Sequence, residues 1–217
     1  MREGLWFSNR RRTHALLRGA AIMLEVGDEV FAAVIDLPPE VHIHDFSTTE
    51  GVVEQFSEQY SIGKYDEERR GMYETELFAD NRFIHMGIDI GAPVYTSVKS
   101  FAEGKIYSFG INSADGDYGP TIIVQHLING VDVWALYGHL STESLANLIV
   151  GQGVESGQRI AWVGDEEENG GWPPHLHFQL SLVKPEGYDI PGVVSPEERL
   201  RARQIYPDPR IVLGPLY

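Results

Sequence analysis

The chain has no cysteine among its 217 residues. This absence excludes disulfide bonds and every zinc site built on thiolates, so any bound metal must be held by histidine or carboxylate side chains. It says little about the compartment in which the protein works. Basic residues are also scarce: 17 Lys and Arg stand against 32 Asp and Glu, a formal charge of -15. Such a chain repels polyanions, so we expect no nucleic-acid partner and weak affinity for anionic surfaces.

The sequence also lacks long apolar runs. No stretch of 18 apolar residues occurs, so we expect no membrane insertion. Near the start, Arg10, Arg11 and Arg12 precede a partly apolar stretch from Ala15 to Leu24, which resembles a signal peptide. Arg18 interrupts that stretch and no small-residue cleavage site follows. We therefore expect a cytoplasmic protein, with export as the alternative.

The sequence pattern of residues 79–184 is typical of a β domain. Short β-branched runs alternate with glycine-containing turns, and Asn129-Gly130 between two apolar runs is a strong hairpin signal. Because the runs follow one another without intervening helices, we predict a mainly β fold, an antiparallel β-roll or sandwich. Ser141–Ile149 is its one expected short helix. The predicted strands are Ile88–Ile90, Val94–Val98, Lys105–Phe109, Thr121–His126, Val131–Tyr137, Arg159–Val163 and His175–Leu182.

Two further regions flank this domain. Residues 1–78 are predicted to form a mixed α/β N-terminal accessory region, and residues 185–217 a C-terminal extension. The N-terminal region is expected to contain helices over 15–24 and 47–60, strands over 30–37 and 41–45, and a surface connector over 62–76. In the extension, Ser195-Pro196-Glu197-Glu198 is a capping box that predicts a short helix to residue 205. Residues 207–213 are expected to be extended.

The first chemical signal is the pair His175 and His177. In a β-strand, residues i and i+2 project from one face, roughly 6.6 Å apart, so both imidazoles would face one pocket. The alternative is a pair of surface histidines on an edge strand. A second such pair, His42 and His44, alternates with apolar residues. We interpret these two histidines as lying on the wetter, solvent-facing side of a half-buried strand.

His85 and Asp89 form the second signal, and His139 the third. Gly87 argues against a helix between His85 and Asp89, yet a fully extended strand would separate them by roughly 13 Å, too far to share one ion. The chain must therefore bend between them, and Gly87 permits the bend. Alone, these residues could equally be a strand-entry histidine and a turn aspartate. His139 ends a strand in Tyr137-Gly138-His139-Leu140, where a lone histidine is more often structural.

Together the three signals resemble the lysostaphin/LytM-type zinc metallopeptidases, which have a peptidoglycan endopeptidase-like duplicated hybrid motif fold. The order His85-x-x-x-Asp89, Tyr137-x-His139, His175-x-His177 is similar to that family's motifs, and the resemblance covers about residues 82–182. Connecting segments match too: Gly87–Tyr95, Tyr118-Gly119, and the paired Gly-Gln turns within 151–164.

The resemblance implies that zinc is bound by His85, Asp89 and His177, and that His139 and His175 are catalytic. Three protein ligands leave a fourth position for water, as catalytic zinc sites do. The implied activity is that of a zinc-dependent metalloendopeptidase acting on peptidoglycan-type cross-links or related peptides. Alternatives are a cytosolic amidase acting on a small peptide or carboxamide, and a non-hydrolytic binding module on the same scaffold. The oligomeric state stays open.

One segment departs from the family pattern. The approach to His175 is long and acidic, with four consecutive carboxylates at residues 165–168. We expect this loop to form a wall of the cleft and to disfavour anionic polymers, unless it is only a solvated loop.

Overall fold

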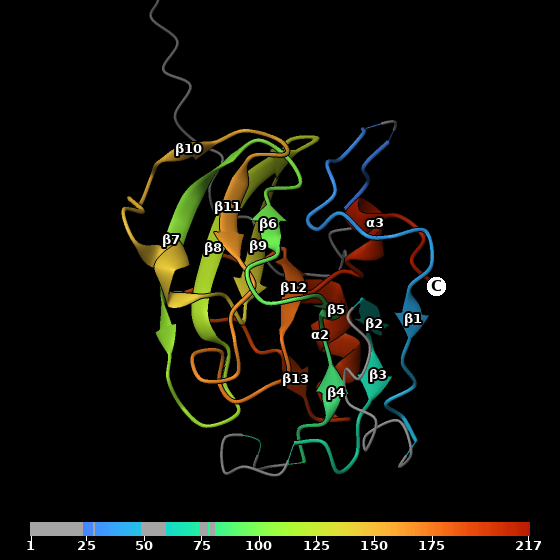
Figure 1. The fold of residues 1–217 in the computed structure, drawn as a ribbon. Helices are drawn as coiled ribbons and strands as arrows, with labels where there is room; N and C mark the ends of the chain where they lie inside the picture. The colour runs from blue at the N-terminus through green and yellow to red at the C-terminus, as the bar shows by residue number, and fades with distance from the viewer. Residues whose placement is uncertain (1–23, 28, 49–59, 74–77, 79–80) are drawn as a thin grey trace, which may run out of the picture.

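One large sheet organises the molecule in the computed structural model, which describes residues 24–27, 29–48, 60–73, 78 and 81–217. Its eight strands run in the order β1-β2-β5-β12-β9-β8-β7-β10 (Figure 1). All neighbouring pairs are antiparallel except β1 and β2. The strands of this sheet are β1 (His42–Ile43), β2 (Ser61–Gly63), β5 (Ile88–Gly91), β7 (Gly104–Asn112), β8 (Gly119–Ile128), β9 (Val131–Gly138), β10 (Gly153–Val154) and β12 (His175–Ser181).

Two smaller sheets complete the β structure. One pairs β6 (Ser97–Lys99) with β11 (Arg159–Trp162), and the other has the order β13-β4-β3. Its strands are β3 (Glu67–Glu68), β4 (Ile84–His85) and β13 (Val193–Val194). The predicted antiparallel, mainly β fold is confirmed. Between β9 and β10 the predicted helix is a single 3₁₀ turn, η2 (Thr142–Leu145).

The main core lies between the large sheet and the β6–β11 pair. Alternating residues of the long strands supply it, as the two-residue period of a strand requires. Ile122 and Val124 of β8 pack with Val98 of β6 and Ala161 of β11, and all four are buried. The intervening Ile123 belongs to a second cluster on the opposite face. Central strands buried on both faces give the site a rigid floor.

The described part of the N-terminal region joins the same structure. β1 and β2 extend the large sheet, and Val34 and Ile35 contribute to its core. The strand predicted over residues 30–37 is wrong, because this segment is irregular and only Val34 and Ile35 of it are buried. The strand at 41–45 exists only as β1, and His44 is buried against Phe46 instead of lying on the wetter face. The helices expected over 15–24 and 47–60 fall almost wholly outside the described residues.

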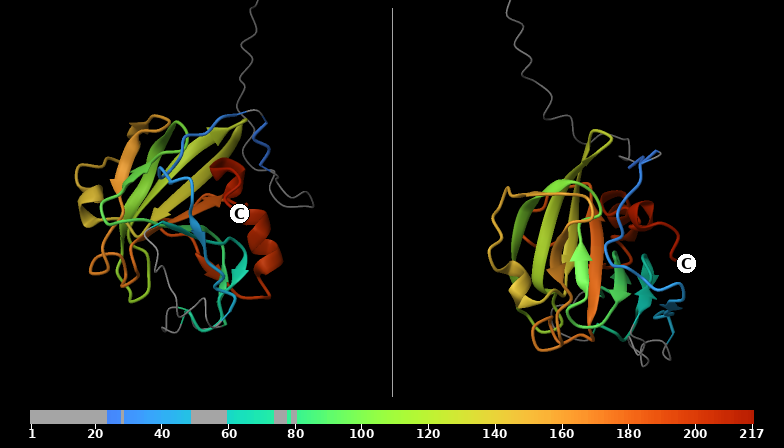
Figure 2. Two further views of the ribbon diagram at one scale, coloured as in Figure 1. Left: turned by 45° about the vertical axis from the view of Figure 1, so that its right-hand side comes forward. Right: turned by 45° about the horizontal axis from the view of Figure 1, so that its top comes forward.

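Two short helices end the chain, on the same side of the molecule as β1 and β2 in both views of Figure 2. The first, α2 (Arg199–Ile205), follows the predicted capping box, in which the Ser195 backbone N–H and Oγ both contact Glu198. The second, α3 (Arg210–Leu213), replaces the extended segment predicted there. Within the described residues no helix is long and apolar enough to cross a membrane.

Candidate metal and catalytic site

Strand register brings the chemistry-bearing residues together. On β12, His177 lies opposite Asp89 of β5 on one side and Gly138 of β9 on the other. His139 follows Gly138 directly, so three neighbouring strands place Asp89, His177 and His139 at one level of the sheet. His175 lies two residues before His177 and lines the same cleft, which confirms that both imidazoles face one pocket.

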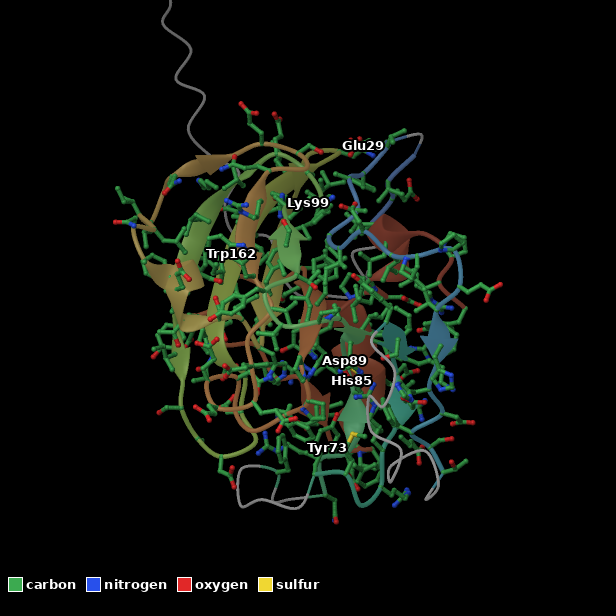
Figure 3. All side chains as sticks on the ribbon, in the orientation of Figure 1. Glu29, Tyr73, His85, Asp89, Lys99 and Trp162 are labelled. Carbon is green, nitrogen blue, oxygen red and sulfur yellow. The ribbon has the colours of Figure 1, made fainter. Side chains whose placement is uncertain are left out.

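His85 reaches this point from the smaller sheet, as the last residue of β4. Its Nε2 lies 3.2 Å from Asp89 Oδ1 and 3.1 Å from His177 Nδ1, and His177 Nδ1 lies 3.0 Å from the same carboxylate oxygen. All three side chains are buried. Figure 3 shows His85 and Asp89 in the lower half of the view, above Tyr73 and well away from Glu29. Three donor atoms therefore converge on one point.

Gly87 stands at the bend between β4 and β5. The bend is confirmed, since one strand ends at His85 and the next begins at Ile88. The reason for glycine is steric, because a Cβ there would lie 2.5 Å from the His177 ring and 3.0 Å from the Phe178 carbonyl oxygen. Gly87 thus makes room for the imidazole that completes the site.

The tautomer of His177 follows from a chain of hydrogen bonds. Gln179 Nε2 donates to the Pro191 carbonyl at 3.1 Å, and this fixes the orientation of the Gln179 amide. Gln179 Oε1 then faces His177 Nε2 at 2.9 Å, so that nitrogen must carry the proton and donate. Nδ1 of His177 is left with a lone pair directed at Asp89.

His85 is fixed in the complementary way. Its Nδ1 donates to the Lys64 carbonyl at 2.9 Å, which leaves the Nε2 lone pair facing His177 Nδ1. His85 Nε2, His177 Nδ1 and Asp89 Oδ1 thus face one another, and none of the three atoms carries a proton. A cation bound between them would relieve the repulsion among their lone pairs. Zinc bonds of about 2.0–2.1 Å put tetrahedral donors about 3.3 Å apart, close to the separations found here. His85, Asp89 and His177 fit a divalent metal.

His139 and His175 complete the cluster. Each is buried, and each donates from Nδ1 to a backbone carbonyl at 2.7 Å: His139 to Asn169 and His175 to Pro173. Their ring centroids are 4.2 Å apart. Burial, and then the neighbouring His175, lower the pKa of His139 well below its usual range. Burial also lowers the pKa of His175. Both are therefore neutral near pH 7, and a neutral imidazole can accept a proton.

The ligand groups are tuned by their surroundings as well. Burial opposes the charged form of Asp89, but His85 and the Arg69 guanidinium outweigh it and hold the pKa of Asp89 well below its usual range. Burial, followed by the Arg69 charge, lowers the pKa of His85 to about 4. An ionised Asp89 beside a neutral His85 is the protonation state that metal binding requires.

The backbone of His139 is strained, with φ of 59° in the left-handed region. Its N–H donates to the Tyr118 carbonyl at 2.8 Å, and its carbonyl accepts from the Gly164 N–H at 2.9 Å. A non-glycine residue in this region costs of order 1–3 kcal/mol, and such strain is concentrated at functional sites. The fold holds His139 there against that cost.

Comparison with known proteins agrees with this geometry. Residues 83–188 match the family model described as Peptidase family M23. The chain contains a peptidase family M23 domain. The DD-carboxypeptidase/endopeptidase Mpg of Neisseria meningitidis serogroup B is 39% identical over 100 residues, which are 46% of this chain and 20% of that protein. Its counterpart from Neisseria gonorrhoeae matches equally. The chain thus spans about a fifth of the length of these curated relatives.

Solved structures similar to this chain include the catalytic domains of two other proteins. The catalytic domain of lysostaphin from Staphylococcus simulans is 26% identical, with a TM-score of 0.43 over 71% of this chain and 98% of that one. The catalytic domain of the M23 protein EnpA from Enterococcus faecalis is 24% identical, with a TM-score of 0.44 over 64% and 89%.

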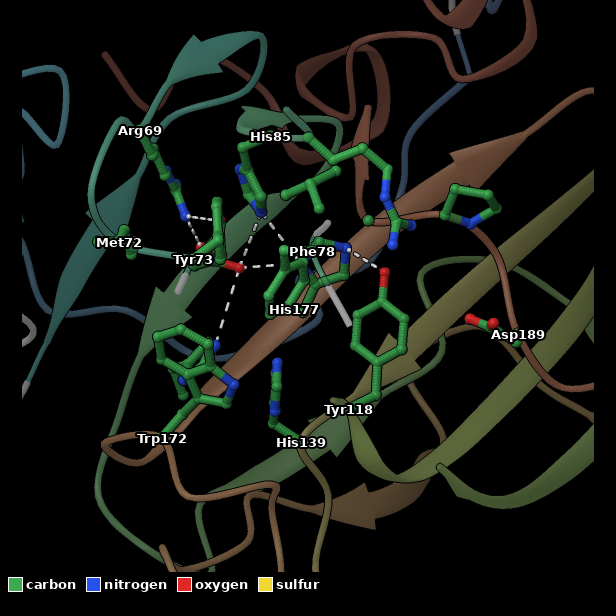
Figure 4. Close-up of a pocket in the computed structure, with 16 residues that line it drawn as sticks. Arg69, Met72, Tyr73, Phe78, His85, Tyr118, His139, Trp172, His177 and Asp189 are labelled. Atoms are coloured by element: carbon green, nitrogen blue, oxygen red, sulfur yellow. Dashed lines mark hydrogen bonds and ion pairs between the residues drawn. The ribbon is translucent and has the colours of Figure 1, made fainter. Parts of the chain in front are cut away.

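The cleft of the M23 domain has an aromatic wall beside the histidines, formed by Tyr73, Phe78 and Trp172 (Figure 4). The expectation for the acidic loop is wrong in one respect, because residues 165–168 are not among those that line the cleft. Glu168 instead accepts a hydrogen bond from the Thr142 backbone. The loop approaches the cleft through Trp172, whose indole N–H donates to the Gly116 carbonyl.

Sequence reasoning missed several residues of the M23 domain's surroundings. Gln179 stands two residues after His177, so the strand period that paired the histidines could have found it. Asn169 accepts the hydrogen bond from His139 with its backbone carbonyl, and any residue type could supply that carbonyl. Arg69 falls in the segment that was interpreted as a surface connector, an interpretation that is wrong because Arg69 and Glu67 are buried.

Proposed function

We propose that this protein is a zinc-dependent metalloendopeptidase, in which His85, Asp89 and His177 hold the ion and His139 and His175 move protons. One observation carries the proposal: two imidazole lone pairs and a carboxylate oxygen meet within 3.0–3.2 Å, with two further neutral histidines beside them. His175 Nε2 lies 3.8 Å from Asp89 Oδ1, so it is close enough to act on a molecule bound at the same point.

A zinc ion held by His85, Asp89 and His177 would supply Lewis acidity, which would polarise a carbonyl and lower the pKa of water towards 7. The side chains of the chain provide the remaining chemistry. Nε2 of His139 or His175 accepts a proton from the attacking water and, once protonated, donates it to the leaving amine. Because their Nδ1 atoms are held by backbone carbonyls, neither ring must rotate to do so. Aromatic side chains beside the cleft limit access of bulk water.

For the substrate we propose a peptide containing glycine or D-amino acids, as in peptidoglycan cross-links. The curated relatives are named DD-carboxypeptidase/endopeptidase, which supports a peptide substrate. The charge of -15 disfavours intact anionic wall polymer and favours soluble fragments. The presence of all five side chains supports an enzyme over a binding module. A cytoplasmic or an exported location stays a prediction.

The test is a cleavage assay followed by mass spectrometry. Purified, zinc-loaded protein is incubated with cross-linked peptidoglycan fragments, glycine-rich peptides and small carboxamides. Hydrolysis of an internal peptide bond, abolished by a chelator and restored by zinc, is the expected result. Hydrolysis of carboxamides alone would establish the amidase alternative. Zinc binding with no hydrolysis of any substrate would favour a binding module.

A further inference from the structure

Arg69 is a fully buried arginine beside the candidate metal site, contributed by the segment that precedes the M23 match. Only 1% of its side chain is exposed. Its Nη1 lies 2.6 Å from Asp89 Oδ2 and 3.2 Å from the Tyr73 hydroxyl, and its Nη2 donates to the Lys64 carbonyl at 3.3 Å. Figure 4 shows Arg69 and Tyr118 on opposite sides of His177.

The guanidinium itself is held in place from two directions. Glu67 Oε2 accepts from Arg69 Nε at 3.0 Å, and the Phe46 ring lies 4.8 Å from the guanidinium carbon. Glu67 is in turn fixed by the Phe46 backbone N–H, which donates to its Oε1. Glu67 Oε1 also lies 3.2 Å from Lys64 Nζ, so Arg69 stands in a network of two basic and two acidic side chains. What Arg69 adds at Asp89 is a charged hydrogen-bond donor that is fixed in position.

Because Arg69 contacts only one carboxylate oxygen of Asp89, the two oxygens have different partners. Oδ2 is occupied by Arg69, while Oδ1 lies 3.0 Å from His177 Nδ1 and 3.2 Å from His85 Nε2. A carboxylate with one oxygen pinned in this way offers a single oxygen to a metal. It also cannot rotate away from the two histidines.

We infer that Arg69 is a positioning residue for the metal, which acts through Asp89 and makes the accessory region part of the site. The inference rests on the proposed metal-binding function. Outer-shell partners of metal-ligating carboxylates and histidines typically contribute about 10- to 100-fold to metal affinity. Lys64 belongs to the same arrangement, because its carbonyl accepts from both Arg69 Nη2 and His85 Nδ1.

The chain provides a matched control in Arg199. This arginine also makes a forked contact with two acidic side chains, with Nε 2.8 Å from Asp66 Oδ1 and Nη1 3.1 Å from Glu68 Oε1. Arg199 is the first residue of α2, and its partners Asp66 and Glu68 lie on the same short segment as Arg69, but it is one-third exposed and does not contact Asp89. Arg199→Met therefore removes an arginine fork without touching the site.

The experiment measures zinc affinity by chelator competition for wild type, Arg69→Met, Arg69→Lys, Arg69→Met/Glu67→Gln and Arg199→Met. The double variant leaves the net charge unchanged, so it separates orientation from charge. Arg69→Lys keeps the buried charge but cannot form the fork. Circular dichroism checks that each protein is folded at the assay temperature. Visible spectra of the cobalt(II)-loaded proteins report the ligand arrangement, which a purely structural arginine would not alter.

We expect zinc affinity to fall about 10- to 100-fold in Arg69→Met, Arg69→Lys and the double variant, with a changed cobalt spectrum. Arg199→Met should match wild type in both measurements. Wild-type affinity and spectrum in folded Arg69→Lys or in the folded double variant would overturn the inference and leave the proposed function intact. A wild-type protein that binds no zinc would instead overturn the proposed function itself. If Arg69→Met does not fold, Arg69→Lys decides the outcome, because it retains the buried positive charge.

Discussion

Asp89 and His177 lie directly opposite each other on adjacent antiparallel strands, with Oδ1 and Nδ1 3.0 Å apart. The contact joins residues 88 positions apart in the chain. Since β5 and β12 are both central in the large sheet, a shift of one residue in their register would turn one of the two side chains to the other face. The fold therefore specifies the site through strand pairing.

Gln179 provides the first prediction, because it fixes the proton on His177. In Gln179→Leu, Nε2 of His177 loses its acceptor, so the lone pair at Nδ1 is no longer enforced. We expect zinc affinity to fall about 10- to 100-fold, measured by chelator competition. Gln179→Glu keeps an acceptor at this position and should retain more of the affinity than Gln179→Leu. Equal affinities in wild type and Gln179→Leu would show that this hydrogen bond does not prepare the ligand.

The proton-transfer roles give a second prediction. His139→Ala and His175→Ala should bind zinc like wild type and lose about 10²- to 10⁴-fold in turnover, the usual contribution of a general acid-base group. Steady-state assays on the cleaved substrate, together with metal analysis, separate the two effects. Unchanged turnover in both variants would remove their catalytic role. Loss of zinc from His175→Ala would mean that the ligand of the His175–His177 pair has been misassigned.

Gly87 supports a third prediction about close packing. A methyl group at this position would meet the His177 ring at 2.5 Å, so Gly87→Ala must displace that ligand. Overpacking of this kind costs about 1–3 kcal/mol, and we expect both lower stability in urea and weaker zinc binding. Gly187→Ala is the control, since a Cβ there has no neighbour within 4 Å. The idea fails if the two variants bind zinc equally well.

Part of this site could be predicted from the sequence, because short-range patterns in the chain indicate it. His175 and His177 follow the two-residue period of a strand, and Gly87 marks a break that an extended strand could not accommodate. The five metal and catalytic positions were assigned through family resemblance. The structure brings all five to one cleft, while their individual roles stay predictions.

The rest depended on long-range pairing that no local pattern encodes. Arg69 resembles any charged residue of a polar segment until β2 and β3 place it beside Asp89. Likewise, His42 and His44 have the same spacing as the pair at the site, yet neither is among the residues that line the cleft. The short helix α3 was missed because two prolines, at 207 and 209, made its segment look extended; Pro209 instead occupies the position just before the first helical residue.

His126 yields a prediction about pH, at a position remote from the cleft. It is buried against Phe101, and burial lowers its pKa to about 4 from the model-compound value of 6.5. Between these two pH values the unfolded chain binds the proton and the folded chain does not, so stability falls as pH falls through this window. The slope is at most about 1.4 kcal/mol per pH unit for one histidine. In His126→Leu, urea unfolding from pH 6.5 to 4 should show a shallower decline; an identical slope would contradict this.

The central claim is that zinc held by His85, Asp89 and His177 makes this chain a peptidase. The most direct measurement is a titration of zinc into chelator-treated protein, with bound metal and peptide-bond hydrolysis followed in the same samples. We predict that hydrolysis rises in proportion to bound zinc and saturates at one ion per chain, and that Asp89→Ala shows neither. Full hydrolysis by zinc-free protein, or wild-type zinc binding in Asp89→Ala, would contradict the account.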